Sequence, residues 1–490
     1  MASIRSWFSL KQTEKDRLSE IESDCEYRER WITIRLVYFS GFLMFLSFGV
    51  VTTSLWPYLE NMDPTVDKTF LSVLFAAPPA GQLIFSPLIG WCSNRLSSIR
   101  VPFVILTGLF IFGHILYSTI ELVCMPYRRY SLLLSRFVFG IATSINTLNR
   151  AFISTATKLS ERTPAISMSS LAQTLGLAVG PMIQSMLSIV GTDGFMWYGL
   201  RFNMYTLGGW ICALVGVVYI VFLNPSWFVH RTIAAREAMK STGCSVVKDT
   251  LEPVQQFSIW AIMISYGVLM FFYVSFQTTL SPISLDQFAW THEESLYYLG
   301  MLLTCGTLCS CGVFLLLPLL CKRFSEHNIF LYFAILPLFC SQVAMIPVGS
   351  KTVEMSTTIH NGSMVGCPIT QEWCMLVPPI NQYQLIISYV LLCISFSVGI
   401  ALSQTILSKL LGIRPQGNWM ALYTSVGGIT RILGPGSVFV YVRFGTYWLF
   451  GLGATLSGLM LVWLFYNKSH LRTTQKVPAA AEMEQLEVSV

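Results

Sequence analysis

Hydrophobic residues along the chain gather in twelve stretches of about 20 residues, and polar or charged segments separate them. A helix of about 20 apolar residues spans the hydrocarbon core of a bilayer, and no water-soluble fold needs twelve of them. The pattern therefore predicts an all-α polytopic membrane protein with twelve transmembrane helices. The predicted spans are 32–56, 69–91, 101–123, 131–156, 165–189, 203–224, 257–282, 296–320, 326–348, 382–408, 417–441 and 445–466.

The spans fall into two groups of six, on either side of a charged segment at 225–256. We therefore expect an N-terminal bundle at 32–224 and a C-terminal bundle at 257–466, joined by a partly helical linker. Residues 1–31 and 467–490 are the predicted tails. Because residues 1–31 are charged and the first apolar run is long, we expect a retained first helix and no cleaved signal peptide.

Charged residues make up only 11% of the chain, against 53% for the AVILMFWYC set, and soluble proteins carry about a quarter charged. The net charge of +6 reflects sidedness rather than nucleic-acid binding, because Lys and Arg concentrate in the loops of one side. By the positive-inside rule this side is cytosolic, and it also holds both termini. Its basic residues are Arg95, Arg100, Lys158, Arg162, several at 231–248, Lys322, Arg323, Lys409, Arg414 and several at 468–476.

The loop at 349–381 is the longest on the opposite, luminal side. Asn361-Gly-Ser363 within it is an N-glycosylation acceptor, which only a luminal position would modify. Cys367 and Cys374 follow in a compartment that permits disulfides, so we expect them to be bridged. We expect no metal site or cofactor, because the other cysteines lie mostly within helices, where they act as small packing residues.

Two small residues four positions apart, the second a glycine followed by proline, recur at matching places in the two halves. Gly176, Gly180 and Pro181 lie within the fifth span, and Gly434 and Pro435 lie within the eleventh. Small residues let helices approach closely, and proline removes a backbone hydrogen bond and bends the helix. These are either two packing sites or two bending points of a transporter built from repeats; the recurrence favours bending.

Three arginines lie inside predicted spans: Arg136 and Arg150 in the fourth and Arg431 in the eleventh. An arginine at a helix centre costs about 2.5–3.5 kcal/mol on insertion scales, so it usually faces a cavity or a partner. Fourteen residues, nearly four helical turns, separate Arg136 from Arg150, so we expect both within about 40° of one helix face, with Asn146 flanking that stripe. Such a cationic interior suits an anion.

Acidic residues are missing from the middle of every predicted span, since Glu60, Glu121 and Asp286 fall at luminal ends. This disfavours a cation carrier and a carrier driven through a buried carboxylate. Alternatives stay open for two of the arginines: Arg150 near the cytosolic end could reach the membrane interface, and Arg136 could pair with Glu60. Arg431 lies nearest the middle of its span and is the best candidate for contact with substrate. His114 is more consistent with a satisfied interior histidine than with a proton sensor. Uncharged candidates for ligand contact, or for ordinary bonding between helices, are Gln82, Gln173, Gln277 and Gln404.

The loop after the second span, from Gly90 through Asn94 and Arg95, resembles the signature loop of the major facilitator superfamily. Arg136 and Gly140 resemble the Arg-x-x-x-Gly motif of that superfamily. Many members have Asp where Asn94 stands; a neutral amide can cap a neighbouring helix but cannot form an ionic latch at the cytosolic gate. The resemblance implies two pseudo-symmetric six-helix bundles, a site between them, and a monomer.

Further strings resemble one branch, that of major facilitator domain-containing protein eight. They include Trp31 to Arg35, Ser54 to Leu59, Cys367 to Cys374, Pro415 to Gly417 and Arg431 to Pro435. The branch implies a lysosomal or endosomal membrane protein linked to chloride, although this chain lacks a clear acidic dileucine signal. Rival functions are export of an organic anion, or a membrane scaffold without transport. A channel-like path would use the same residues as a carrier. We expect no enzyme, since the chain shows no catalytic set.

Overall fold

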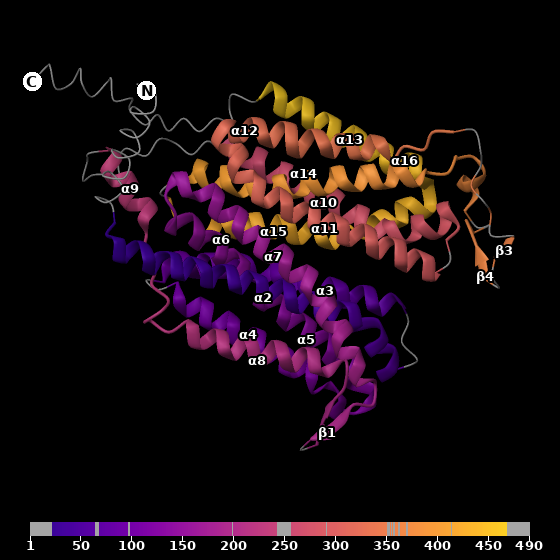
Figure 1. The fold of residues 1–490 in the computed structure, drawn as a ribbon, viewed down its shortest axis with the longest axis horizontal. Helices are drawn as coiled ribbons and strands as arrows, with labels where there is room; N and C mark the ends of the chain where they lie inside the picture. The colour runs from indigo at the N-terminus through magenta and orange to yellow at the C-terminus, as the bar shows by residue number, and fades with distance from the viewer. Residues whose placement is uncertain are drawn as a thin grey trace, which may run out of the picture.

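The computed structural model describes residues 22–63, 68–96, 99–197, 199–242, 256–290, 292–349, 353, 355, 358–360, 363–368, 371–412 and 414–467. Long helices run side by side along the molecule in two groups (Figure 1). The group built from residues 22–242 is called the N-half, and the group built from residues 256–467 is called the C-half. The prediction of an all-α polytopic fold is confirmed.

The helices of the N-half are α2 (Asp24–Met62), α3 (Lys68–Arg95), α4 (Arg100–Ser118), α5 (Arg128–Ala142), α6 (Ile145–Ala156), α7 (Leu159–Leu187), α8 (Thr206–Phe222) and α9 (Ile233–Thr242). Those of the C-half are α10 (Gln256–Phe288), α11 (His292–Arg323), α12 (Glu326–Ile329), the π-helix η4 (Phe330–Ile335), α13 (Leu336–Ala344), α14 (Gln382–Leu411), α15 (Gly417–Leu433) and α16 (Gly436–Tyr466). Short 3₁₀ turns are η1 (Ile120–Leu122), η2 (Met125–Tyr127), η3 (Ser188–Val190) and η5 (Glu372–Met375).

Two antiparallel hairpins, β1 (Phe195–Trp197) with β2 (Leu200–Phe202) and β3 (Thr358–His360) with β4 (Ser363–Val365), lie at one end of the molecule. The helix α9 lies at the other end (Figure 1). The two ends are called the hairpin end and the α9 end. This arrangement agrees with the prediction that the linker and the 349–381 loop lie on opposite sides, while the assignment of each end to a compartment stays a prediction.

Ten helical segments of the described chain are long and apolar enough to cross a membrane, and α8 is a shorter apolar helix. The eleventh predicted span is divided, because α15 ends at Leu433 and α16 begins at Gly436. The first part of α16 continues this span as far as Gly445, where φ of +84° and ψ of −174° interrupt the helix. The remainder of α16 is the twelfth span. Proline and glycine explain both interruptions, because Pro435 cannot donate a backbone hydrogen bond and only glycine tolerates this φ.

The fourth span also consists of two helices, because Thr143 and Ser144 form a turn between α5 and α6. The amide of Asn146 donates to the carbonyl of Thr143 at 3.0 Å, as in a tight turn rather than an α-helix. Arg136 and Arg150 therefore lie on separate helices. The single face calculated for a continuous helix does not apply to them.

Helix packing is similar within each half and extensive between the halves. In the N-half α2 packs along α7, and in the C-half α10 packs along α15. Between the halves α3 packs along α15, α7 contacts α11 and α14, and α6 contacts α15. The helices that carry the predicted arginines Arg150 and Arg431 thus meet at the boundary between the halves.

Candidate functional site

Arg150 reaches from α6 across the boundary and contacts two residues of α15. Its Nη1 donates a hydrogen bond to Oγ1 of Thr424 at 3.3 Å, and its guanidinium carbon lies 4.7 Å from the centre of the Tyr423 ring. The residue is 8% exposed, so it is buried between the halves. A guanidinium over an aromatic face is stabilised by the ring quadrupole, and this contact gains strength when it is desolvated.

Tyr423 belongs to an aromatic stack beneath this guanidinium. Its ring stacks on that of Tyr266 from α10, with centroids 3.9 Å apart, and its hydroxyl lies 2.7 Å from Oγ of Ser403 on α14. Three helices of the C-half therefore fix the aromatic surface on which Arg150 of the N-half rests. Neither tyrosine was predicted, although Tyr423 and Arg431 lie eight residues apart on α15, roughly two helical turns.

Arg431 lies on α15 and is held by two neutral acceptors. Its Nε donates to the carbonyl of Gly427 at 3.0 Å, and its Nη2 donates to Oε1 of Gln82 at 2.8 Å. Gln82 lies on α3 and donates in turn from Nε2 to the carbonyl of Thr143 at 3.0 Å. A chain of hydrogen bonds thus connects α15 of the C-half to α3 and to the α5–α6 turn of the N-half.

The two arginines form one electropositive site at the boundary. Tyr266 lies between them, because its ring stacks on Tyr423 beneath Arg150 and its hydroxyl approaches Gly427, whose carbonyl accepts from Arg431. Within the described chain, neither guanidinium forms an ion pair with a carboxylate. We call Arg150, Arg431, Gln82, Tyr266, Tyr423 and Thr424 the boundary site.

Polar atoms around the boundary site lack partners. Of the buried side-chain atoms that the structure describes, Oδ1 of Asn146, Oγ1 of Thr147, Nε of Arg150 and Oγ of Ser425 have no hydrogen-bond partner. Three of them come from α6 and one from α15. A buried polar group without a partner costs free energy, so this region gains from a polar ligand or water.

Arg136 has different surroundings, within the N-half. It is 2% exposed, and its guanidinium carbon lies 5.9 Å from the ring centre of Phe48 and 5.1 Å from that of Phe139. Its Nε and Nη2 have no hydrogen-bond partner, and no ion pair joins it to Glu60 in the described chain. The neighbouring His114 bonds the carbonyl of Phe110 through Nδ1 at 2.8 Å, as expected for a satisfied interior histidine.

The other predicted polar candidates are dispersed. Gln173 packs against Gly41 inside the N-half, and Gln277 is exposed and donates to the hydroxyl of Tyr273 at 3.0 Å. Gln404 is buried on α14. Of the uncharged candidates, Gln82 bonds Arg431 directly, and Asn146 lies about one helical turn before Arg150 on α6.

Close contacts join the halves at the α9 end. A Cβ atom at Gly90 would lie 2.5 Å from Cβ of Ala421 and 2.6 Å from the carbonyl oxygen of Gly417, so α3 and α15 touch there through backbone. Oδ1 of Asn94 accepts a hydrogen bond from the amide of Gly417 at 3.0 Å and thereby caps the start of α15. Arg95 stacks on Trp91, 4.9 Å from the ring centre, on the exposed side of α3.

Two further contacts close this end. Arg162 of α7 is buried and donates from Nη1 to the carbonyl of Ser408 on α14 at 3.2 Å. Glu326 at the start of α12 accepts a hydrogen bond from the hydroxyl of Thr163 and pairs with Lys409 at 2.8 Å. The structure is therefore a conformation in which the halves are closed against each other at the α9 end.

Comparison with known proteins agrees with this architecture. The profile of the Major Facilitator Superfamily matches residues 37–367. The chain belongs to the major facilitator superfamily. It is 30% identical over 475 residues to the major facilitator superfamily domain-containing protein 8 of Xenopus laevis, with 91% of this chain and 92% of that protein covered.

More distant relatives share part of the chain or only its fold. An SPX domain-containing membrane protein of Arabidopsis thaliana is 27% identical over 206 residues, which cover 42% of this chain and 28% of that protein. Among solved structures, the human organic anion transporter MFSD10 superposes with a TM-score of 0.64 at 16% identity, covering 90% of this chain and 99% of that one. The proton:xylose symporter XylE superposes with a TM-score of 0.61 at 12% identity, covering 89% and 95%.

The glycine motifs of this superfamily member mediate close helix packing in both halves. A Cβ at Gly176 would overlap the carbonyl oxygen of Phe42, and one at Gly180 would lie 2.8 Å from Cα of Gly49, so both need glycine for the approach of α2. The helix α7 continues through Pro181. Gly434 packs against Val274 of α10, and there the helix does break before Pro435.

The hairpin end of the C-half contains the loop that joins α13 to α14. Cys367 and Cys374 form a disulfide in the structure, and both are buried. Between them Trp373 donates from Nε1 to the carbonyl of Val442 at 3.1 Å, and its ring fills the space that a Cβ at Gly445 would need. The predicted glycosylation residue Asn361 lies outside the described residues.

An ion-pair network at the α9 end was not predicted from the sequence. Arg30 is fully buried and pairs with Glu22 at 2.7 Å and with Glu161 at 2.8 Å, while Lys158 also pairs with Glu22 at 2.7 Å. A capping box of Ser23 and Glu26 starts α2 at Asp24, eight residues before the predicted span. The Ser-x-x-Glu pattern was the sequence signal for this earlier start of the helix. The network joins the start of α2 to the loop before α7.

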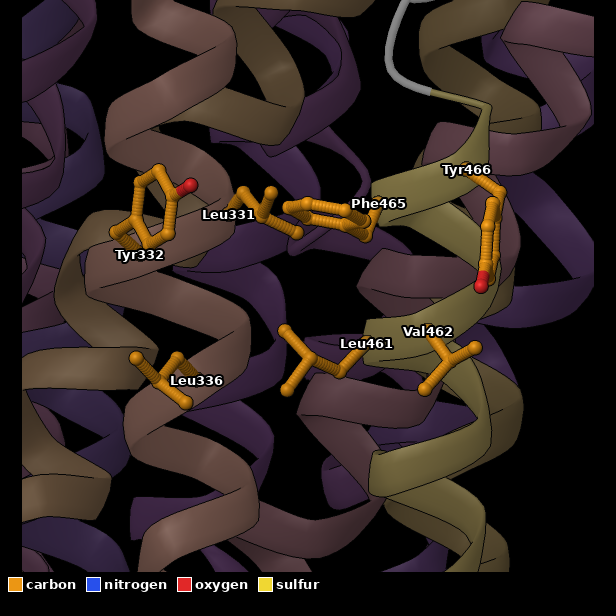
Figure 2. Close-up of a pocket in the computed structure, with 7 residues that line it drawn as sticks. All are labelled: Leu331, Tyr332, Leu336, Leu461, Val462, Phe465 and Tyr466. Carbon is orange, nitrogen blue, oxygen red and sulfur yellow. The ribbon is translucent and has the colours of Figure 1, made fainter.

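Two apolar grooves lie on the surface at residues outside the boundary site. One of about 300 Å³ lies between η4, α13 and α16, and Figure 2 shows its seven apolar or aromatic lining residues. A second lies between α3 and α5 and is lined by alanine, valine, leucine and aromatic side chains. No charged side chain lines either groove, so both suit lipid chains better than an anion.

Proposed function

We propose that this transporter moves a small anion, chloride by resemblance to its branch, across the lysosomal or endosomal membrane. The observation that carries the proposal is a pair of buried arginines along one stretch of α15, Arg150 from the N-half and Arg431 from the C-half, without a carboxylate partner in the described chain. Two cations in a low-dielectric region repel each other and attract an anion. The same charges oppose the entry of a cation.

The organisation of the site supports alternating access. Arg150 belongs to the N-half and rests on Tyr423 of the C-half, so relative rotation of the halves would change the distance between the two cations. The closed contacts at Gly90 and Asn94 join the halves at the α9 end. An anion would then enter from the hairpin end and leave after these contacts open.

The cellular address rests on two separate arguments. Sidedness rests on the basic loops of the predicted cytosolic side, which place the α9 end in the cytosol. The lysosomal or endosomal membrane rests on similarity to the branch of the superfamily that the Xenopus protein represents. Immunofluorescence of the tagged chain against lysosomal and plasma-membrane markers tests this address; confinement to the plasma membrane would reject it.

The substrate is tested by flux of radioactive chloride into proteoliposomes that contain the purified protein. Arg431→Gln removes one charge of the boundary site but keeps a hydrogen-bonding side chain, and we expect it to lower chloride flux at least tenfold. Arg443→Gln is the matched control, because Arg443 is exposed on α16. Equal nonzero fluxes for wild type and Arg431→Gln would reject the boundary site as the anion path.

Two rival functions give different results in the same assay. An organic-anion exporter would show no chloride flux but would accumulate carboxylated or phosphorylated solutes, with loss in Arg431→Gln. A membrane scaffold would transport neither class, and cells would tolerate Arg431→Gln while requiring the tails at 1–31 and 467–490. Chloride flux that depends on Arg431 would reject the scaffold.

A further inference from the structure

The hydrogen bonds of Arg431 occupy the edge of the guanidinium that an anion would need. Nε and Nη2 point in the same direction and form the fork that binds carboxylates, phosphates or a halide. Here Nε donates to the carbonyl of Gly427 at 3.0 Å and Nη2 donates to Oε1 of Gln82 at 2.8 Å. Both acceptors are neutral. Both donors of the fork are therefore satisfied without an anion: Nε bonds its own helix, and Nη2 bonds Gln82 of the N-half.

Gln82 would lose its hydrogen bond to Arg431 if this fork bound an anion instead. It is 2% exposed, and its Nε2 donates to the carbonyl of Thr143 at 3.0 Å. That carbonyl belongs to the turn between α5 and α6, two residues from the start of α6, which carries Arg150. One amide therefore connects Arg431 to α3 and to the turn that precedes the second arginine.

We propose that Gln82 is a positioning residue that ties Arg431 to the N-half until an anion replaces its amide oxygen. The proposal rests on the proposed function, because it requires an anion at Arg431. A hydrogen bond from a guanidinium to an anion is stronger than one to a neutral amide, so the exchange is favourable. No covalent chemistry is involved; the guanidinium exchanges one acceptor for another.

The exchange acts on the helix pair that closes the α9 end. Gln82 lies eight residues before Gly90 on α3, about 12 Å along the helix. At Gly90 the same helix touches α15 through backbone, and at Asn94 it caps α15. Release of Gln82 removes one crosslink between α3 and α15, so anion binding favours opening of this end. Gln82 would thereby couple occupation of the site to the change of access.

The test measures chloride flux as a function of chloride concentration in proteoliposomes that contain the full-length protein. In Gln82→Leu the competing acceptor is lost, and we expect the half-saturating chloride concentration to fall about tenfold. In Gln82→Glu the new carboxylate would pair with Arg431 in place of the anion, and we expect the maximal flux to fall at least tenfold. Gln382→Glu is the matched control, because Gln382 is exposed at the start of α14.

The outcomes separate this proposal from the proposed function. Unchanged half-saturation in Gln82→Leu together with unchanged flux in Gln82→Glu would overturn the role of Gln82, while flux that depends on Arg431 would leave the anion path intact. Equal flux in wild type and Arg431→Gln would overturn both. Should Gln82→Leu unfold, Gln82→Met keeps the length of the side chain without an acceptor oxygen and is expected to show the same fall in half-saturation.

Discussion

A single methyl group at Gly90 should force the two halves apart at the α9 end. A Cβ there would lie 2.5 Å from Cβ of Ala421 and 3.1 Å from the carbonyl carbon of Gly417. Carbon atoms in contact lie about 3.5–4.0 Å apart, so Gly90→Ala requires α3 and α15 to separate by about 1 Å. The obstacles are the backbone of Gly417 and the Cβ atom of Ala421, both on α15. No side-chain rotation can therefore relieve the overlap.

The cost of this overlap applies only to the closed conformation. Overpacking of this kind costs about 1–3 kcal/mol, which corresponds to a shift of about 5- to 150-fold between two conformations. The intrinsic gain of alanine over glycine in a helix, about 0.5–1 kcal/mol, is the same in both conformations and cancels. Gly90→Ala is therefore expected to favour the state that is open at the α9 end without unfolding the protein.

Hydrogen–deuterium exchange measures this shift directly. The amide of Gly417 donates to Asn94 only while the end is closed, and we expect its exchange to accelerate at least fivefold in Gly90→Ala. Gly108→Ala in α4 is the control, because a Cβ there meets nothing within 4 Å. Identical exchange at Gly417 in both variants, with equal thermal stability, would refute the closure that we describe.

Three further predictions concern stability and topology. Gly445→Ala should lower the melting temperature of the detergent-solubilised protein, because alanine is strained at this positive φ by about 1–3 kcal/mol and its Cβ would overlap Trp373. Gly451→Ala is the control, because a Cβ there meets nothing within 4 Å. Equal melting temperatures for the two variants would contradict this prediction. Arg30→Met removes one of the two cations that pair with Glu22 and the cation that pairs with Glu161, and it should cost about 3 kcal/mol, against less than about 1 kcal/mol for Arg231→Met at a partly exposed pair. A similar fall in stability in both variants would count against the buried network. Glycosidase should shift the gel mobility of wild type but not of Asn361→Gln; a shift that persists in the variant would place the sugar elsewhere.

The spans were predictable because the bilayer imposes a length on every crossing helix, whatever its neighbours. The sequence also indicated the interruption at Gly434 and Pro435, because proline acts through its own backbone. The turn at Thr143 and Ser144 gave no such signal. It lies in a run without glycine or proline after Gly140, and its tight hydrogen bonding is supported by Gln82 from another helix. An interruption that depends on a tertiary contact cannot be predicted from local sequence.

The sequence indicated which residue types form the candidate site, but it did not indicate which of these residues lie together. Burial of charge in an apolar span marked Arg136, Arg150 and Arg431 as unusual. Which of them share a site depends on the rotation of each helix about its axis, and the turn after α5 changes that rotation. Arg150 and Arg431 both make contacts across the boundary, whereas Arg136 contacts Phe48 and Phe139 within the N-half.

The two-fold repeat explains the arrangement of the helices but not the positions of the two arginines of the boundary site. Arg431 lies four residues before Pro435, and the matching residue before Pro181 in the first half is Leu177. The second cation, Arg150, comes from the fourth span and not from the fifth, which is the counterpart of the eleventh. The site is therefore built from non-equivalent positions on a pseudo-symmetric frame. This is consistent with the similar folds of an organic anion transporter and a xylose symporter at 16% and 12% identity, because a few side chains at the boundary can change the substrate while the helices keep their arrangement.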